Sequence, residues 1–316
     1  TLCGTHIGGY VPFAVDITDA LEAGRLNEIL IAVKGLACYR KEFRPEIPWD
    51  LGTGFSRAML VPGRTGWHKR NPDGLAGSVR LQTAGPVAAA FPFVQAHFQE
   101  RTLTASVELT NHTGTASAGT VVYRVLDPDN ADAVVTEFAS APVELAAGQT
   151  ATVAATGSAQ DLVPWWPRIP GTPAGLPGAS APKLYTLRAM VVANDDRVID
   201  VLDDAFGYRE VTIEGTGLYV NGRRVNFRSL ISGAGRTIEE TFANWRAARC
   251  NTLRLPHTGW NDHFTRDRQR ATVRYADKHG IAVRFNSQIN GMFIDLATGS
   301  PAFWHNATDY WRKVVK

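Results

Sequence analysis

Short apolar stretches that alternate with polar residues dominate the middle of the chain. Between about residues 87 and 206, segments such as FVQAHFQ, LTASVELTN and AGTVVYRVLD recur at intervals typical of a sandwich. Turns rich in Gly, Pro, Asp and Asn separate them. Alternation with a period of two places successive side chains on opposite faces of a strand. We therefore expect an all-β sandwich in this part of the chain.

The N-terminal part also favours antiparallel β structure. YVPFAVDI is followed by NEILIAVKG, whose apolar residues around Ile29–Ile31 predict a buried strand. From Leu36 to about Gly77 the pattern changes to Gly, Pro, Trp and Arg without periodicity. A stretch of this length without periodicity indicates a long surface loop, which is a candidate functional segment.

After about residue 206 the pattern becomes one of alternating strands and helices. The pair Asn221–Gly222 between two extended runs predicts a hairpin. TIEETFANWRAARC predicts an amphipathic helix with Thr237 as N-cap. NTLRLPH predicts a strand, FTRDRQRATVRYADKHG a helix closed by Gly280, IAVRFNS a strand, and PAFWHNATDYWRKVVK the start of another helix. This order is how a parallel β/α structure begins, and three such units are too few to close a barrel of eight.

Composition excludes some classes of function and leaves others open. The 33 basic and 30 acidic residues are interspersed, so no nucleic-acid patch stands out, and no apolar run approaches the roughly 20 residues of a membrane span. Cys3, Cys38 and Cys250 match no metal or redox motif, and a Cys3–Cys38 disulfide is left open. In the Pro-rich run VPWWPRIPGTPAGLPG, Trp165 and Trp166 are either packing anchors or exposed stacking platforms, and packing is favoured.

Three linked motifs resemble glycoside hydrolase family 2, the family of β-galactosidases, β-glucuronidases and β-mannosidases. HIGGYVPFAVDITDALEAGRLNEILIAV resembles the end of its sugar-binding jelly-roll domain. APKLYTL with IDVLDDAFGYREVTIEGTGLYVNGRRVNFRS resembles the passage from its immunoglobulin-like domain into the catalytic barrel, and CNTLRLPH with YADKHGIAV resembles strand, helix and strand of that barrel. The resemblance implies a multidomain chain: a partial jelly roll over residues 1–84, an immunoglobulin-like β-sandwich over 85–206, and the truncated start of a (β/α)8 TIM barrel over 207–316.

The resemblance also implies residues of a sugar site. Arg254 matches an arginine that supports the nucleophilic carboxylate, and His257 matches a histidine that contacts the sugar in β-galactosidases. A guanidinium holds a carboxylate through two parallel hydrogen bonds, which suits an arginine at the end of a buried strand. A structural ion pair for Arg254 and a satisfied, non-binding His257 are the alternatives. Trp260 is expected to stack on a sugar face.

The loop RTGWHKRNPDGLAG resembles the segment in which the jelly roll reaches toward the active site. Trp67 and Asp73 in this loop are therefore weaker candidates for sugar contacts. A loop that merely packs on the barrel is the alternative.

The catalytic carboxyl groups are expected outside this chain. Retaining glycosidases use two carboxyl groups about 5 Å apart, an acid/base and a nucleophile. The resemblance places both after Lys316, so no catalytic residue is assigned here; Glu239 and Glu240 suit a surface helix, and Asp277 matches a structural position. AVRFNSQING lacks the carboxylates that bind magnesium in some β-galactosidases, so neither a metal nor a cofactor is expected.

The function that follows is a retaining β-glycosidase that hydrolyses O-glycosidic bonds of oligo- or polysaccharides, with this chain as a fragment that lacks both catalytic glutamates. The alternative is a non-catalytic carbohydrate-binding or scaffold fragment. A carbohydrate is the expected partner, with neither nucleic acid nor membrane. Homo-oligomerisation, export to the periplasm or the medium, and the identity of the sugar and linkage are left open.

Overall fold

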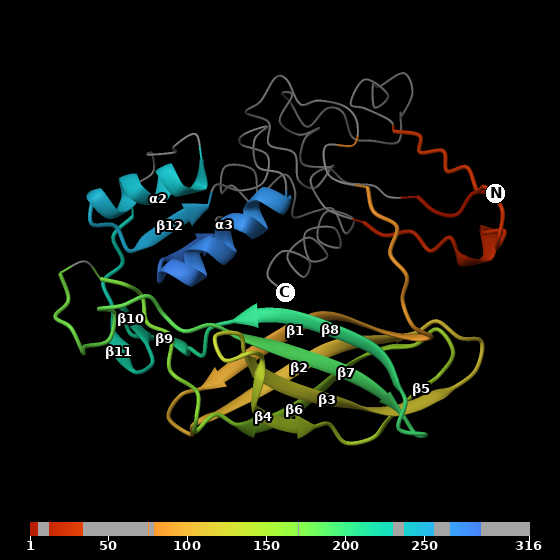
Figure 1. The fold of residues 1–316 in the computed structure, drawn as a ribbon, viewed down its shortest axis with the longest axis horizontal. Coiled ribbons are helices and arrows are strands. Elements are labelled where there is room, and N and C mark those ends of the chain that lie inside the picture. Colours follow the sequence, from red (N-terminus) through yellow and green to blue (C-terminus); the bar gives the residue numbers. More distant parts are fainter. Residues whose placement is uncertain are drawn as a thin grey trace. The chain divides into compact units, whose positions relative to one another are not determined.

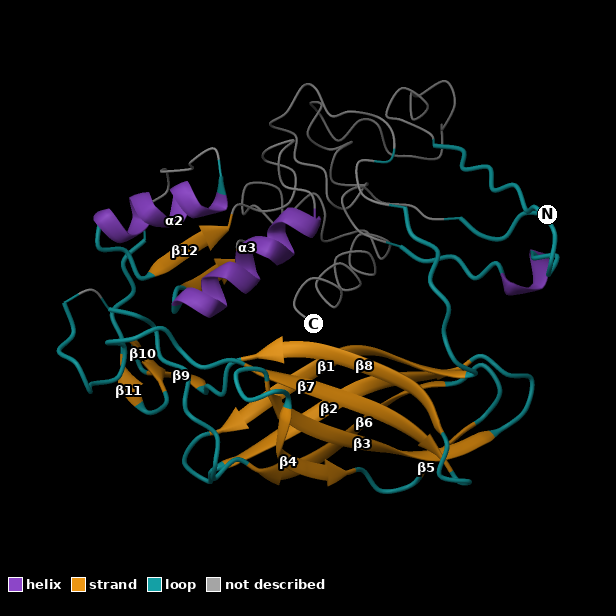
Figure 2. Cartoon of the chain, viewed as in Figure 1, coloured by secondary structure: helices purple, strands orange, loops and turns teal. Residues whose placement is uncertain are grey.

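The computed structural model describes residues 1–5, 13–33, 75, 79–169, 171–229, 237–255 and 266–285 (Figure 1). The chain divides into two compact units, one containing Thr1–Arg80 and the other containing Leu81–Arg254 and Thr272–Arg284. Strands dominate the described part of the second unit (Figure 2). The predicted β-rich character of the chain is therefore confirmed.

Two antiparallel sheets make up most of the second unit. The first has the order β1-β2-β6, and the second has the order β4-β3-β7-β8 with β5 paired to β3. The strands of the first sheet are β1 (Val87–His97), β2 (Thr102–Asn111) and β6 (Thr150–Ser158). Those of the second are β3 (Ser117–Asp127), β4 (Ala133–Ala139), β5 (Val143–Leu145), β7 (Tyr185–Ala193) and β8 (Val198–Phe206).

The core lies between these two sheets and follows from the alternating pattern. In β2, every second residue from Leu103 to Leu109 is buried, and they meet buried residues of β3 and β7 in one apolar cluster. Tyr123 of β3 is fully buried there, and its hydroxyl donates to the Val153 carbonyl of β6 at 2.7 Å. Since β3 and β6 belong to different sheets, this hydrogen bond ties the two layers together.

A hairpin follows the last strand of the sandwich. β9 (Val211–Glu214), β10 (Gly217–Val220) and β11 (Arg223–Arg224) form a small antiparallel sheet in the order β11-β10-β9. Asn221 and Gly222, between β10 and β11, have φ values of 49° and 71°. Two successive positive φ values are what a type I′ turn requires, so the Asn-Gly hairpin prediction is confirmed.

The strands and helices predicted beyond this hairpin are also present. They are α2 (Ile238–Ala247), β12 (Thr252–Leu255), α3 (Arg266–His279) and β13 (Ala282–Phe285), and β12 and β13 are neighbours in one sheet. The Thr237 hydroxyl accepts from the Glu240 amide at 3.1 Å, which is the predicted N-cap of α2. The two helices contact each other through the rings of Phe242 and Tyr275, 4.7 Å apart. Whether this segment opens an eight-stranded barrel stays a prediction.

The N-terminal unit differs from the expectation. The described residues between 1 and 80 contain the short 3-10 helix η1 (Thr18–Ala20) and no strand, so the strand predicted from NEILIAVKG is absent over residues 27–33. Leu26, Ile29 and Leu30 are exposed by 102%, 61% and 91%. A strand needs a paired neighbour to satisfy its backbone and an opposing surface to bury its side chains. Among the described residues no strand pairs with this segment, and the jelly roll stays a prediction.

No helix in the described ranges is long and apolar enough to cross a membrane.

Candidate functional site

Arg254 is the one predicted site residue that the structure describes, and it is described by its backbone. It is the third residue of β12. Trp67, Asp73, His257 and Trp260 lie outside the described residues. The structure therefore describes the contacts that hold β12 in place. The roles of these five residues stay predictions.

Hydrogen bonds on two sides hold the start of β12. The backbone amides of Asn251 and Thr252 donate to the Arg228 carbonyl at 3.1 and 3.2 Å. On the other side, the Ala282 amide of β13 donates to the Asn251 carbonyl at 3.1 Å. The strand that carries Arg254 thus begins between the segment around Arg228 and β13.

The side chain of Asn251 fixes the same point. It is 1% exposed, and its Nδ2 donates to the Asn226 carbonyl at 3.0 Å while its Oδ1 accepts from the Arg228 amide at 2.7 Å. A buried amide is tolerated where its donor and its acceptor are both satisfied. Sequence reasoning missed Asn251, although an asparagine directly before a buried strand was a visible signal.

Trp165 lies in the Pro-rich segment between β6 and β7, which we call the linker, and contacts the end of α3. Its ring is buried, and Nε1 donates to the Asp277 carbonyl at 2.9 Å. Its backbone amide donates to the Tyr208 carbonyl at 2.8 Å, and its carbonyl accepts from Asn221 Nδ2 at 2.9 Å. The preference for Trp165 as a packing anchor is confirmed. Trp166 is half-buried, with its ring centre 6.2 Å from that of Phe98.

Arg209 lies over Trp165 and beside Asp277. The guanidinium carbon is 4.5 Å from the centre of the indole, within range of a cation–π contact. Arg209 Nη1 is 2.9 Å from Asp277 Oδ1, yet this buried Nη1 has no well-aligned hydrogen bond, so the ion pair is close in distance and poor in direction. Burial raises the pKa of the Asp277 carboxyl, and the charge of Arg209 opposes this rise.

Gly280 closes α3 against the same linker. Its φ is 71°, and its carbonyl accepts from the Arg168 amide at 2.6 Å. A Cβ at this position would lie 2.7 Å from the Arg168 nitrogen. Only glycine meets both conditions, the left-handed backbone and the close approach of another chain segment.

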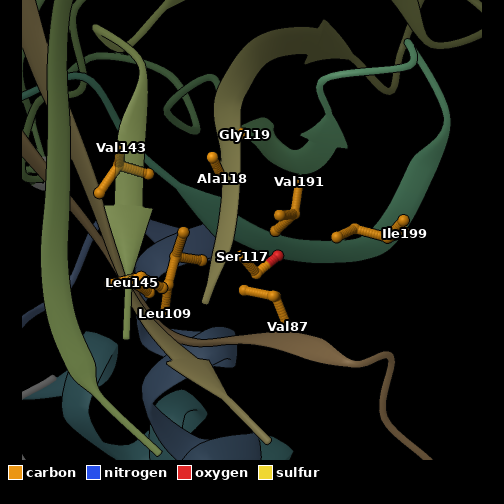
Figure 3. Close-up of a pocket in the computed structure, with 9 residues that line it drawn as sticks. All are labelled: Val87, Leu109, Ser117, Ala118, Gly119, Val143, Leu145, Val191 and Ile199. Atoms are coloured by element: carbon orange, nitrogen blue, oxygen red, sulfur yellow. The ribbon is translucent and has the colours of Figure 1, made fainter. Parts of the chain in front are cut away.

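One small cavity lies within the sandwich (Figure 3). It measures about 10 Å³, about the room for one water molecule. Its lining is almost entirely apolar and includes Val87, Leu109, Leu145 and Val191. Ligand pockets occupy about 300–1,000 Å³ and carry polar groups that orient the ligand, so this cavity is a packing gap between the sheets and not a sugar site.

Acidic, histidine and cysteine side chains in the described ranges are the remaining candidates for metal or redox chemistry. Within those ranges, no group of three or more His, Cys, Asp or Glu residues could hold a metal ion. At the end of β3, Asp127 and Asp129 share one cation, since Lys183 Nζ lies 2.5 Å from both Asp127 Oδ1 and Asp129 Oδ2. Cys3 and Cys250 are free thiols, and Cys38 lies outside the described residues.

The described residues thus define a β-rich, multidomain chain in which a two-sheet body precedes a strand, a helix and a strand. Residues 90–209 match the family model of the glycosyl hydrolases family 2. The resemblance of this chain to glycoside hydrolase family 2 is therefore confirmed.

Individual relatives agree with the family match. A β-glucuronidase of Formosa agariphila is 24% identical over 270 residues, which are 79% of this chain and 24% of that protein. The crystal structure of a family 2 β-galacturonidase from Eisenbergiella tayi bound to galacturonate has a TM-score of 0.52 at 17% identity, over 73% of this chain and 38% of that chain. The crystal structure of a family 2 β-galacturonidase from Eisenbergiella tayi bound to glycerol gives a TM-score of 0.51 at 17% identity, with the same coverage of both chains. The chain thus spans about a quarter of the β-glucuronidase and 38% of the β-galacturonidase.

Proposed function

We propose that the complete protein containing this chain is a retaining β-glycosidase of family 2. The observation that carries the proposal is the family match over residues 90–209, followed along the chain by the strand, helix and strand that the family resemblance predicts. The proposed division is a partial jelly roll over 1–84, an immunoglobulin-like sandwich over 85–206, and the start of a TIM barrel over 207–316.

In this proposal Arg254 supports the nucleophilic carboxylate. Active sites of such barrels form at the carboxyl ends of the strands, and Arg254 is next to last in β12. A planar guanidinium there can orient a carboxylate and favour its ionised form. The nucleophile and the acid/base are assigned to residues after Lys316, with His257 and Trp260, and more weakly Trp67 and Asp73, as sugar contacts.

The relatives suggest which substrates to test first. One is named a β-glucuronidase and another a β-galacturonidase, so we propose β-linked uronic acids as the substrate class. Aryl β-glucuronide and aryl β-galacturonide are the first assays, and aryl β-galactoside and β-mannoside test the neutral sugars.

Paired arginine variants of the complete protein test the role of Arg254. Arg254 is the third residue of β12, whereas Arg197 lies in the turn between β7 and β8 of the sandwich and pairs with Asp195 at 2.7 Å. We expect Arg254→Ala to lower kcat/KM by about 10²-fold or more, since it removes electrostatic support at the reacting centre. Arg197, which is exposed and lies outside the proposed barrel, serves as the control, and Arg197→Ala should keep parental activity.

The thermal transitions of both variants should stay within a few degrees of the parent. Full activity of Arg254→Ala would remove this residue from the site. Sugar binding without any hydrolysis by the complete protein would favour the carbohydrate-binding alternative.

A further inference from the structure

We propose that Arg209 is a positioning residue for the end of β12, acting through Trp165, Asp277 and the turn between α3 and β13. Its effect on catalysis rests on the proposed function, because that function assigns Arg254 to the active site. Its effect on the structure of β12 does not. Contacts among described residues of the second unit connect Arg209 to β12 in three steps.

The first link fixes Arg209 to the sandwich. The residue before it, Tyr208, is fully buried, and its hydroxyl donates to the carbonyls of His97 and Thr102 at 3.1 and 3.3 Å. The residue after it, Glu210, accepts through Oε2 from the Phe98 amide at 3.3 Å. Arg209 is therefore held on both sides at the end of the sandwich formed by β1 and β2.

The second link passes from Arg209 to the last turn of α3. The guanidinium carbon lies over the buried Trp165 ring, 4.5 Å from its centre, and Nη1 lies 2.9 Å from Asp277 Oδ1. Trp165 itself donates to the Asp277 carbonyl. Gly207 allows this arrangement, because a Cβ there would lie 2.5 Å from the Trp165 ring. Trp165 thus contacts the backbone carbonyl of Asp277, and Arg209 contacts the carboxylate of the same residue.

The third link passes from α3 to the strand that carries Arg254. The Ile281 amide donates to the Ala276 carbonyl at 2.9 Å, which fixes the chain as it leaves α3. The next amide, that of Ala282, donates to the carbonyl of the buried Asn251. Arg254 follows Asn251 by three residues, about 10 Å along an extended strand. A displacement of the turn would therefore be passed to β12 through a single hydrogen bond and the strand pairing.

Charge explains why an arginine suits this position. Nearby groups on α3 and its surroundings are mostly cationic: burial lowers the pKa of His279, and the charges of Arg246, Lys278 and Arg168 lower it further. Arg274 is paired with Asp204 at 3.8 Å. Asp277 gives Arg209 an opposite charge in this setting, and the flat guanidinium can stack on an indole while it does so. Lysine would keep the charge and lose the planar stacking.

A neighbouring pair supplies a matched control. Arg223 lies over Trp166 at 5.9 Å, as Arg209 lies over Trp165 at 4.5 Å. Arg223 is exposed, and no contact with α3 is observed for it among the described residues. Arg209→Met and Arg223→Met therefore remove the same chemical group from adjacent arginine–tryptophan pairs, of which one reaches Asp277.

The experiment is hydrogen exchange of the complete natural protein, followed by mass spectrometry of its peptides. For Arg209→Met we expect exchange at least about tenfold faster in peptides covering 250–255 and 276–285, the effect of about 1.4 kcal/mol on local opening. Peptides covering 103–109 in the sandwich core should be unchanged. Arg209→Lys should give a smaller acceleration in the same peptides, and Arg223→Met should match the parent.

The pH dependence of hydrolysis separates positioning from lost folding. Unfolded enzyme lowers the rate equally at all pH values. A displaced Arg254 would instead raise the pKa of the carboxylate that it supports, moving the acid limb of kcat/KM upward by up to about one pH unit in Arg209→Met. The acid limb of Arg223→Met should stay in place.

The outcomes distinguish the two proposals. If the complete protein hydrolyses no β-glycoside, the proposed function fails, and hydrogen exchange still decides whether Arg209 positions β12. Unchanged exchange at 250–255 and 276–285 in Arg209→Met overturns the positioning role, as does equal acceleration in the sandwich core. If Arg209→Met does not fold, Arg209→Lys decides on the same criteria.

Discussion

Replacing Trp165 by phenylalanine removes one donor and part of one ring from the contact between the linker and α3. Phenylalanine has no Nε1, so the Asp277 carbonyl loses its hydrogen bond of 2.9 Å. That carbonyl keeps a longer bond from the Gly280 amide, 3.3 Å, so the loss is one hydrogen bond, about 0.5–1.5 kcal/mol. Arg209, whose guanidinium carbon is 4.5 Å from the centre of the indole, would also meet a phenyl ring, which is a weaker cation–π partner than an indole. The cation–π contact is worth about 0.5–2 kcal/mol.

The two losses share the same residues and are therefore not strictly additive. We expect Trp165→Phe to lower the free energy of unfolding by about 1–3 kcal/mol. Trp166→Phe serves as the control, because Trp166 is half-buried. Its ring lies edge-to-face with that of Phe98, with 6.2 Å between the ring centres. This second substitution should cost less than about 1 kcal/mol.

Urea unfolding followed by far-ultraviolet circular dichroism is the suitable assay, because the tryptophan substitutions alter fluorescence directly. The transition midpoint of Trp165→Phe should fall well below those of the parent and of Trp166→Phe, with a similar slope. Equal midpoints for the two variants would refute the reasoning that Trp165 is the residue that joins the linker to α3.

Two further predictions concern the end of α3. Gly280→Ala should destabilise the protein by at least about 2 kcal/mol, because φ is 71° and the new Cβ would lie 2.7 Å from the Arg168 nitrogen. Gly175→Ala, at φ 84° with nothing within 4 Å of the new Cβ, should cost about 1 kcal/mol, and equal urea midpoints would contradict the steric argument. Because burial raises the pKa of Asp277 in the folded state, the stability contributed by its neutral form is complete below the ordinary carboxyl pKa and is lost as the pH rises through the raised value. The melting temperature of Asp277→Asn minus that of the parent should therefore increase with pH across this range, and a difference that is constant or falls would contradict the raised pKa.

The sequence predicted much of the second unit because its local signals agree with its tertiary contacts. Alternation in β2 is matched by the buried Leu103 and Leu109, and the Asn221–Gly222 pair forms the expected turn because these two residues accept positive φ values. The Thr237 cap and Gly280 mark the ends of helices for equally local reasons. In each case a few adjacent residues contain the whole physical cause.

The features that sequence reasoning missed depend on distant partners. NEILIAVKG has the residues of a strand, but a strand also needs a neighbour, and the described residues supply none over 27–33. The contacts of Trp165, Arg209 and Asp277 join residues up to 112 positions apart, and no periodic pattern signals such a meeting. Arg254 was assigned through family resemblance, and the structure adds the two-sided hydrogen bonding of the strand that carries it.

The proposed function, a retaining β-glycosidase, predicts which anomer of the sugar the complete protein releases first. The most direct test is to follow hydrolysis of an aryl β-glucuronide and an aryl β-galacturonide by the complete natural protein with proton nuclear magnetic resonance. A retaining mechanism forms a covalent glycosyl–enzyme intermediate, so the β-anomer of the released sugar should appear first and then mutarotate. First release of the α-anomer would contradict retention, and no hydrolysis of any β-glycoside would contradict the assignment as a glycosidase.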